Sequence, residues 1–139
     1  MSYALGSVIA AGLAALAVLV HYEALNLLDR VSRLFDGHRS VLLLVMLGLL
    51  AAHVVEIWVF ALGFATVDAW ASAPMFEPSG LSLRDYAYFS AMVYTTVGFG
   101  DIVPQGAMRM LTSAEALTGL ALITWSASYT FLHMRKLWD

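Results

Sequence analysis

The sequence predicts an all-α membrane protein with three transmembrane helices and one short helix that enters the membrane without crossing it. Of its 139 residues, 61% are hydrophobic and only 12% are charged, a composition typical of an integral membrane protein. Long apolar stretches recur along the chain, and a short aromatic segment followed by glycines separates the last two. The chain has no cysteine, which excludes disulfides and thiolate metal sites. A net charge of −3 gives no indication of nucleic-acid binding.

Residues 1–22 form the first predicted transmembrane helix. The apolar run from Tyr3 to Val20 is rich in alanine and is close to the minimum of about 17–18 residues that span a bilayer core. A cleaved signal peptide is the alternative, but no basic residue precedes the apolar run. We therefore expect a retained helix.

Residues 23–40 form a predicted amphipathic linker on the cytoplasmic side. Leu25, Leu28 and Val31 recur at helical spacing, while charged residues such as Glu23 and Arg30 fill the opposite face. One interpretation is a helix that lies along the membrane surface. The other is a cytoplasmic extension of the first transmembrane helix.

The remainder, residues 41–139, is predicted as one pore domain. Residues 41–66 form an outer transmembrane helix, long enough to cross with tilt. Residues 67–82 contain Pro74, Pro78 and Gly80 and form an irregular loop, or turret. An inner transmembrane helix over 106–134 completes the domain.

Residues 83–95 form the predicted short helix. Ser82 followed by Asp85 resembles a capping box. At about 1.5 Å per residue, this helix extends roughly 20 Å, too short for a bilayer core of about 30 Å. A helix of half the membrane thickness before a glycine-rich loop indicates a re-entrant pore helix, whose C-terminal end carries partial negative charge.

Residues 96–101 follow as a loop with the sequence TVGFGD. Glycine permits φ > 0, so the alternation of Gly98 and Gly100 with other residues lets successive carbonyls point toward one axis. The loop resembles the TVGYG filter of potassium channels, with Phe99 in place of tyrosine. Over residues 41–134 the chain is similar to small bacterial members of the potassium channel superfamily that consist of the pore alone. The N-terminal transmembrane helix lies outside this resemblance.

The resemblance implies a homotetramer in which four filter loops surround one axis. The residues that would bind K⁺ are Thr96, Val97, Gly98, Phe99 and Gly100. Thr95 and Asp101 would support them. Met92 stands where some relatives place a glutamate that pairs with this aspartate, so we expect Asp101 to bond instead with Tyr88 or with a neighbouring chain.

The inner helix contains a possible hinge and a possible gate. Gly119 resembles the hinge glycine of the superfamily, although close packing of small residues explains it equally well. Ile123, Ala127 and Phe131 recur every four residues and would face the pore if Gly119 aligns with that hinge. Phe131 would then form a hydrophobic constriction; the alternative places it against lipid.

Three ionisable residues lie at membrane depth, where such groups indicate a function or a buried pair. His53 and Glu56 share one helix face. They predict either a hydrogen-bond network to a pore-helix tyrosine or Glu115, or a proton sensor. Glu115 is predicted to support the filter from behind, through Thr95, Tyr94, backbone N–H groups or the His53–Glu56 pair. A pore-facing acid that concentrates cations is the alternative.

The expected function is passive, potassium-selective conduction across a bacterial inner membrane, without enzymatic activity. K⁺ is the only expected cofactor, and the expected partners are further copies of the chain and membrane lipids, with no nucleic acid or organic substrate. The distribution of Lys and Arg places the N-terminus outside and the C-terminus in the cytoplasm. A weakly selective cation channel, a non-conducting accessory subunit and a loop that is only a structural turn remain as alternatives.

Overall fold

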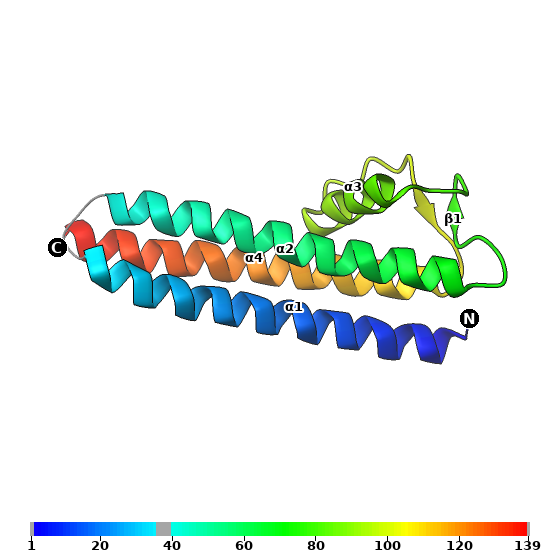
Figure 1. Cartoon of the computed structure of the whole chain (residues 1–139), viewed down its shortest axis with the longest axis horizontal. Coiled ribbons are helices and arrows are strands. Elements are labelled where there is room, and N and C mark those ends of the chain that lie inside the picture. The colour runs from blue at the N-terminus through cyan, green and yellow to red at the C-terminus, as the bar shows by residue number, and fades with distance from the viewer. Residues whose placement is uncertain (1, 36–39, 139) are drawn as a thin grey trace.

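The protein is a bundle of three long helices with a short fourth helix on one side, seen in a computed structural model that describes residues 2–35 and 40–138 (Figure 1). The long helices are α1 (Tyr3–Ser32), α2 (Ser40–Trp70) and α4 (Met108–Trp138). A 3-10 turn, η1 (Arg33–Phe35), follows α1. The short helix α3 (Leu83–Tyr94) lies between two strands in the chain, β1 (Phe76–Glu77) and β2 (Val103–Pro104).

Two of the described helices, α1 and α2, are long and apolar enough to cross a membrane. At about 1.5 Å per residue, each of the three long helices reaches roughly 45 Å. The helix α4 has this length, but its serines and threonines lower its hydropathy below that of the other two. It runs alongside α1 and α2 over their length (Figure 1), and its crossing of the membrane stays a prediction.

Helix α1 differs from the sequence-based boundaries, because it continues without a break through residue 32 instead of ending near residue 22. The apolar face predicted for a surface helix is buried in the protein: Leu25 and Leu28 pack against Val41, Val45 and Leu49 of α2. Packing against α2 removes these side chains from water without a membrane surface. The linker is thus an extension of α1 as far as residue 35, and residues 36–39 lie outside the described part of the chain.

An aromatic cluster holds α3 against the bundle. Phe64 of α2 meets Phe89 of α3 and Phe76 of β1 edge-to-face, with ring centroids 5.1 and 5.9 Å apart. Phe76 also contacts Phe89 and Tyr86 in the same way. Edge-to-face contacts of this kind contribute about 0.5–1.5 kcal/mol each beyond the burial of their area, so they fix the position of α3.

Polar bonds fix both ends of the segment that contains α3. Ser82 and Asp85 form the predicted capping box, and the hydrogen bonds from Ser82 lower the pKa of Asp85. Asp68 accepts from the Met75 N–H at 2.8 Å and from the Tyr86 hydroxyl at 2.5 Å. The antiparallel pair β1–β2 joins the chain before α3 to the chain after the loop.

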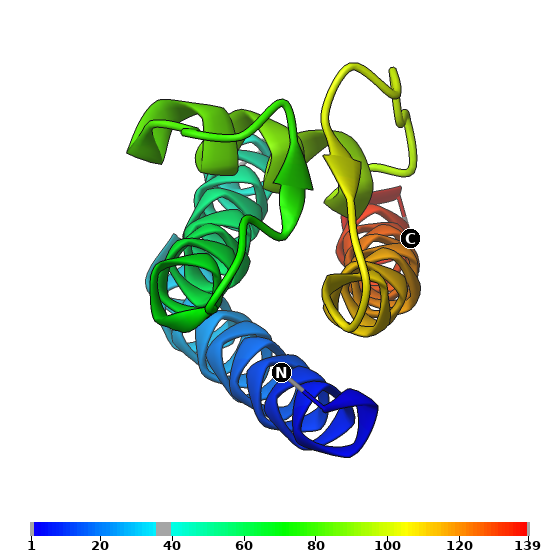
Figure 2. The same ribbon diagram turned by 90° about the vertical axis from the view of Figure 1, so that its right-hand side faces the viewer.

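The two sides of the α2–α4 pair have different partners. Viewed along the bundle, α1 lies on one side of the pair, whereas α3 and the loop that follows it lie on the other (Figure 2). The N-terminus lies at the same end of the bundle as β1 and β2, and the C-terminal end of α4 lies at the opposite end (Figure 1). This relative placement matches the predicted topology, while the side of the membrane stays a prediction.

Candidate functional site

The loop after α3 alternates between left-handed and ordinary backbone conformations. Thr96, Gly98 and Gly100 have φ of 61°, 55° and 78°. Val97 and Phe99 lie between them and do not have positive φ. This alternation lets carbonyl groups of successive residues point in one direction. Thr96 is β-branched, so its positive φ is strained, and such strain clusters at functional sites.

The loop is bound closely to the end of α3. The Thr96 N–H donates to the Val93 carbonyl at 2.9 Å, and the Gly98 N–H donates to the Met92 carbonyl at 3.1 Å. The Thr95 hydroxyl donates to the Ala91 carbonyl at 2.7 Å. These bonds make the loop a direct continuation of the helix end, where the partial negative charge of the helix dipole lies.

Large apolar side chains of the loop are exposed in the single chain. Val97 is 54% exposed and Phe99 is 72% exposed, and residues 95–101 are all exposed. In contrast, Tyr94 immediately before them is fully buried. An exposed apolar segment supported by a buried base indicates a surface that is completed by another molecule.

The outer end of the loop brings Tyr88 and Asp101 together. The Tyr88 hydroxyl lies close enough to the Asp101 carboxylate to interact with it. Sequence reasoning named Tyr88 or a neighbouring chain as the partner of this aspartate. This interaction joins the middle of α3 to the residue after the glycines, so both ends of the loop interact with the same helix.

Glu115 lies behind α3 and is fully buried. It forms a hydrogen bond with the Ser90 hydroxyl, which also lies 2.7 Å from the Ile57 carbonyl of α2. The expected partners were Thr95, Tyr94 and the His53–Glu56 pair. The partner is instead one helical turn before Tyr94, because Glu115 meets α3 nearer its middle than its end.

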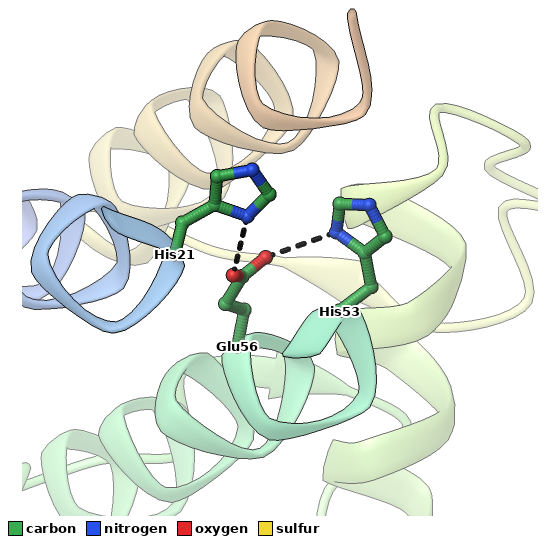
Figure 3. Close-up of side chains that lie close together, drawn as sticks. All are labelled: His21, His53 and Glu56. Carbon is green, nitrogen blue, oxygen red and sulfur yellow. Dashed lines mark hydrogen bonds and ion pairs between the residues drawn. The ribbon is translucent and has the colours of Figure 1, made fainter. Parts of the chain in front are cut away.

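A second polar cluster joins α1, α2, α3 and α4. Glu56 accepts hydrogen bonds from ring nitrogens of His21 at 2.9 Å and His53 at 3.0 Å (Figure 3). The Tyr94 hydroxyl bonds with Glu56 and lies 2.8 Å from His53 Nδ1. The Ser126 hydroxyl lies 3.0 Å from His53 Nε2 and 3.4 Å from His21 Nε2.

Sequence reasoning identified only part of this polar cluster. The His53–Glu56 pair was expected to reach a pore-helix tyrosine or Glu115, and the pair does contact Tyr94. His21 and Ser126 were missed. The available signal was that His21 ends an apolar stretch of membrane length, where an ionisable side chain rarely faces lipid.

Gly119 packs directly against the end of α3. A Cβ at this position would collide with the backbone carbonyl of Tyr94. Helix α4 passes through Gly119 without interruption from Met108 to Trp138. The close approach favours the packing interpretation of this glycine over the hinge.

The predicted gate residues line a groove between α2 and α4. The groove has a volume of about 670 Å³ and is apolar, and the buried Tyr94 and the exposed Thr95 also contribute to its wall. Ile123 is 38% exposed and Phe131 is 59% exposed, and Ala127 lies between them along α4. The stripe therefore faces outward from the single chain, on the same groove as the end of α3.

Comparison with known proteins assigns most of the chain to a family. The sequence model of a protein family described as an ion channel matches residues 41–136, which is more than half of the chain. No curated protein and no solved structure gives a significant match. The matched region contains α3, the loop and nearly all of α2 and α4, whereas α1 lies before it. The chain therefore belongs to the ion channel family.

Proposed function

We propose that the protein is a potassium-selective channel in which four copies of the loop 96–101 surround one conduction axis. The observation that carries this proposal is the alternating backbone of Thr96, Gly98 and Gly100 within a TVGFG sequence. A row of carbonyl oxygens directed at one axis replaces the hydration shell of K⁺, as in the TVGYG filter. No covalent chemistry is involved, and K⁺ is the permeating ion.

The need for four chains follows from the loop itself. One copy supplies one wall of a filter, and its apolar side chains are exposed in the single chain. A closed ring of identical subunits buries the same surface on each copy. Helix α1 lies on the side of α2 and α4 away from the loop (Figure 2), so it occupies the periphery of such a ring and does not obstruct the axis.

Charge near the axis favours cations. The C-terminal end of α3 carries partial negative charge, and four such ends would be directed toward the space below the filter. Asp101 adds a carboxylate at the mouth of the loop. The predicted location is the inner membrane of a bacterium, with the N-terminus and filter outside.

Ion flux into liposomes that contain only this protein tests the proposal. K⁺ or Rb⁺ uptake that is blocked by barium, with far slower Na⁺ uptake, is the expected result. Equal uptake of both ions would instead support a weakly selective cation channel. No uptake by a protein that crosslinks as a tetramer would support a non-conducting accessory subunit.

A further inference from the structure

Two histidines from different helices direct the same type of ring nitrogen at one carboxylate. The Nδ1 atoms of His21 on α1 and His53 on α2 lie 2.9 and 3.0 Å from the two oxygens of Glu56 (Figure 3). One ligating atom from each residue lies within 4.8 Å of the others. His21 and Glu56 are fully buried, and the side chain of His53 is 15% exposed.

With two neutral histidines, this cluster has too few hydrogen-bond donors for its acceptors. If both Nδ1–H groups donate to Glu56, both Nε2 atoms are acceptors and both face the hydroxyl of Ser126. That hydroxyl has one hydrogen and can satisfy only one of them. If His53 instead carries its hydrogen on Nε2, Tyr94 must donate to Nδ1 of His53, and the second oxygen of Glu56 is left without a donor among the described residues. Among the described residues, the ion-pair partners of Glu56 are these two histidines alone, so its charge is buried without a permanent counter-charge, which is costly.

A divalent metal ion would resolve both deficits. With Nδ1 of each histidine and one oxygen of Glu56 as ligands, each imidazole keeps its hydrogen on Nε2. Both Nε2–H groups can then donate to Ser126, because a hydroxyl oxygen accepts two hydrogen bonds. Histidine ligands of metals almost always donate their other ring N–H to such a partner.

Tyr94 completes the polar surroundings. Its hydroxyl bonds with Glu56 and lies 2.8 Å from His53 Nδ1, so it can hold the second carboxylate oxygen or act as a fourth ligand. Tetrahedral zinc, with bonds of roughly 2.0–2.1 Å, separates its ligand atoms by about 3.3 Å. The two Nδ1–Glu56 distances of 2.9 and 3.0 Å are a few tenths of an ångström shorter than this separation, and the three ligand atoms all lie within 4.8 Å of one another.

The donor set selects the class of metal. Imidazole suits zinc and neighbouring first-row transition metals, whereas magnesium, calcium and manganese prefer oxygen ligands. Trp125 of α4 lies against His21, with ring centroids 5.4 Å apart, and further shields the cluster from water. His53 and Tyr94 also line the groove between α2 and α4, so the cluster borders an open groove of the single chain.

We propose that His21, His53 and Glu56 form a structural transition-metal site, best suited to Zn²⁺, that fastens α1 to the helices of the pore. The site joins the peripheral helix to Tyr94, the residue at the base of the filter. This inference goes beyond ion conduction and does not require it, because the site lies within one chain.

Zinc titration of the untagged, full-length protein in detergent micelles tests the site after metals are removed by a chelator. The expected result is one tightly bound Zn²⁺ per chain and a rise in the thermal unfolding midpoint. Co²⁺ as a spectroscopic substitute should give the visible absorption of a tetrahedral site with nitrogen and oxygen ligands. This absorption reads out the native protein and does not depend on whether a variant folds.

Variants locate the binding. His21→Ala and Glu56→Gln should lower Zn²⁺ affinity by more than the roughly 10–100-fold expected for loss of a supporting residue. Ser126→Ala should lower it by about 10–100-fold. His133→Ala is the matched control, because His133 bonds with the Tyr129 carbonyl at the end of α4, and it should bind zinc as the unmodified chain does.

Three outcomes would overturn the proposal. One is binding of Zn²⁺ below one ion per chain without a tetrahedral Co²⁺ spectrum. Another is equal loss of binding in His133→Ala and His21→Ala. The third is a chelator-treated protein whose stability changes with pH but not with Zn²⁺, which would identify an added proton as the cation that balances Glu56.

Discussion

Tyr94 lies between two regions: the loop 96–101 with Thr95 before it, and the cluster of His21, His53 and Glu56. The two regions differ in how much of each a single chain can form. The loop is exposed and contains a strained threonine. The cluster is buried, and the side chains that contact one another in it all belong to one chain. In the proposed channel, one chain builds the support of the filter alone, whereas the conducting surface needs further copies.

Gly98→Ala should have the largest effect on K⁺ selectivity, because it changes the loop, which a single chain leaves exposed. The added Cβ meets no atom of the same chain, so its cost comes from the positive φ and is roughly 1–2 kcal/mol per subunit. The cost recurs in each subunit around the axis. We expect loss of selective K⁺ flux in liposomes while the monomer fold, measured by circular dichroism, is kept.

Gly12→Ala is the matched control for this change. A Cβ at Gly12 also meets no atom, but Gly12 lies within α1 and has no positive φ. Helix propensity predicts a small stabilisation of up to about 1 kcal/mol and unchanged flux. Normal selectivity in Gly98→Ala would show that the loop does not form the filter.

Gly119→Ala should have the next largest effect on K⁺ selectivity, since it disturbs the contact between α4 and Tyr94, although its cost in stability can exceed that of Gly98→Ala. The new Cβ would collide with the Tyr94 carbonyl, and overpacking of this kind costs about 1–3 kcal/mol. The expected result is a lower thermal midpoint together with reduced selectivity. A variant with full stability and altered opening alone would restore the hinge interpretation.

Glu115→Ala should cost less, about 1 kcal/mol for the lost hydrogen bond, because Ser90 retains the Ile57 carbonyl as a partner. Glu115→Gln should be milder still, since a glutamine amide can donate to the Ser90 hydroxyl. Thermal melts of the tetramer measure which of the two variants is more destabilised. If both variants reduce conductance equally, and most strongly at low salt, Glu115 acts as a pore charge and not as a support.

Phe131→Ala should have the smallest effect on stability, within about 0.5 kcal/mol, because the ring is 59% exposed in the chain. If four rings narrow the pore, their removal should raise resting flux. Leu132→Ala is the control, because Leu132 is 51% exposed on the neighbouring helix position. Equal flux in both variants would place Phe131 against lipid.

The sequence was sufficient for features that depend on local chemistry. The capping box at Ser82 and Asp85 predicted the start of α3. The glycine alternation at 98 and 100 predicted the unusual backbone of the loop. These features follow from backbone torsions and bonds between near neighbours, which a short stretch of sequence specifies.

Features that depend on contacts between distant residues could not be predicted. Leu25 and Leu28 have the spacing of a membrane-surface helix, and only their packing against α2 shows that they extend α1 within the bundle. Two other contacts, between Ser90 and Glu115 and between Ser126 and the histidines, depend in the same way on the relative axial position of neighbouring helices. Small serines carry no periodic signal that would reveal these contacts.

The most direct test of the proposed function is the reversal potential of the purified protein in a planar bilayer with K⁺ on one side and Na⁺ on the other. A filter formed by residues 96–100 predicts a potential close to the K⁺ equilibrium value, lost in Gly98→Ala and kept in Gly12→Ala. A reversal potential near zero, with ample current from both ions, would contradict a potassium-selective filter in this loop.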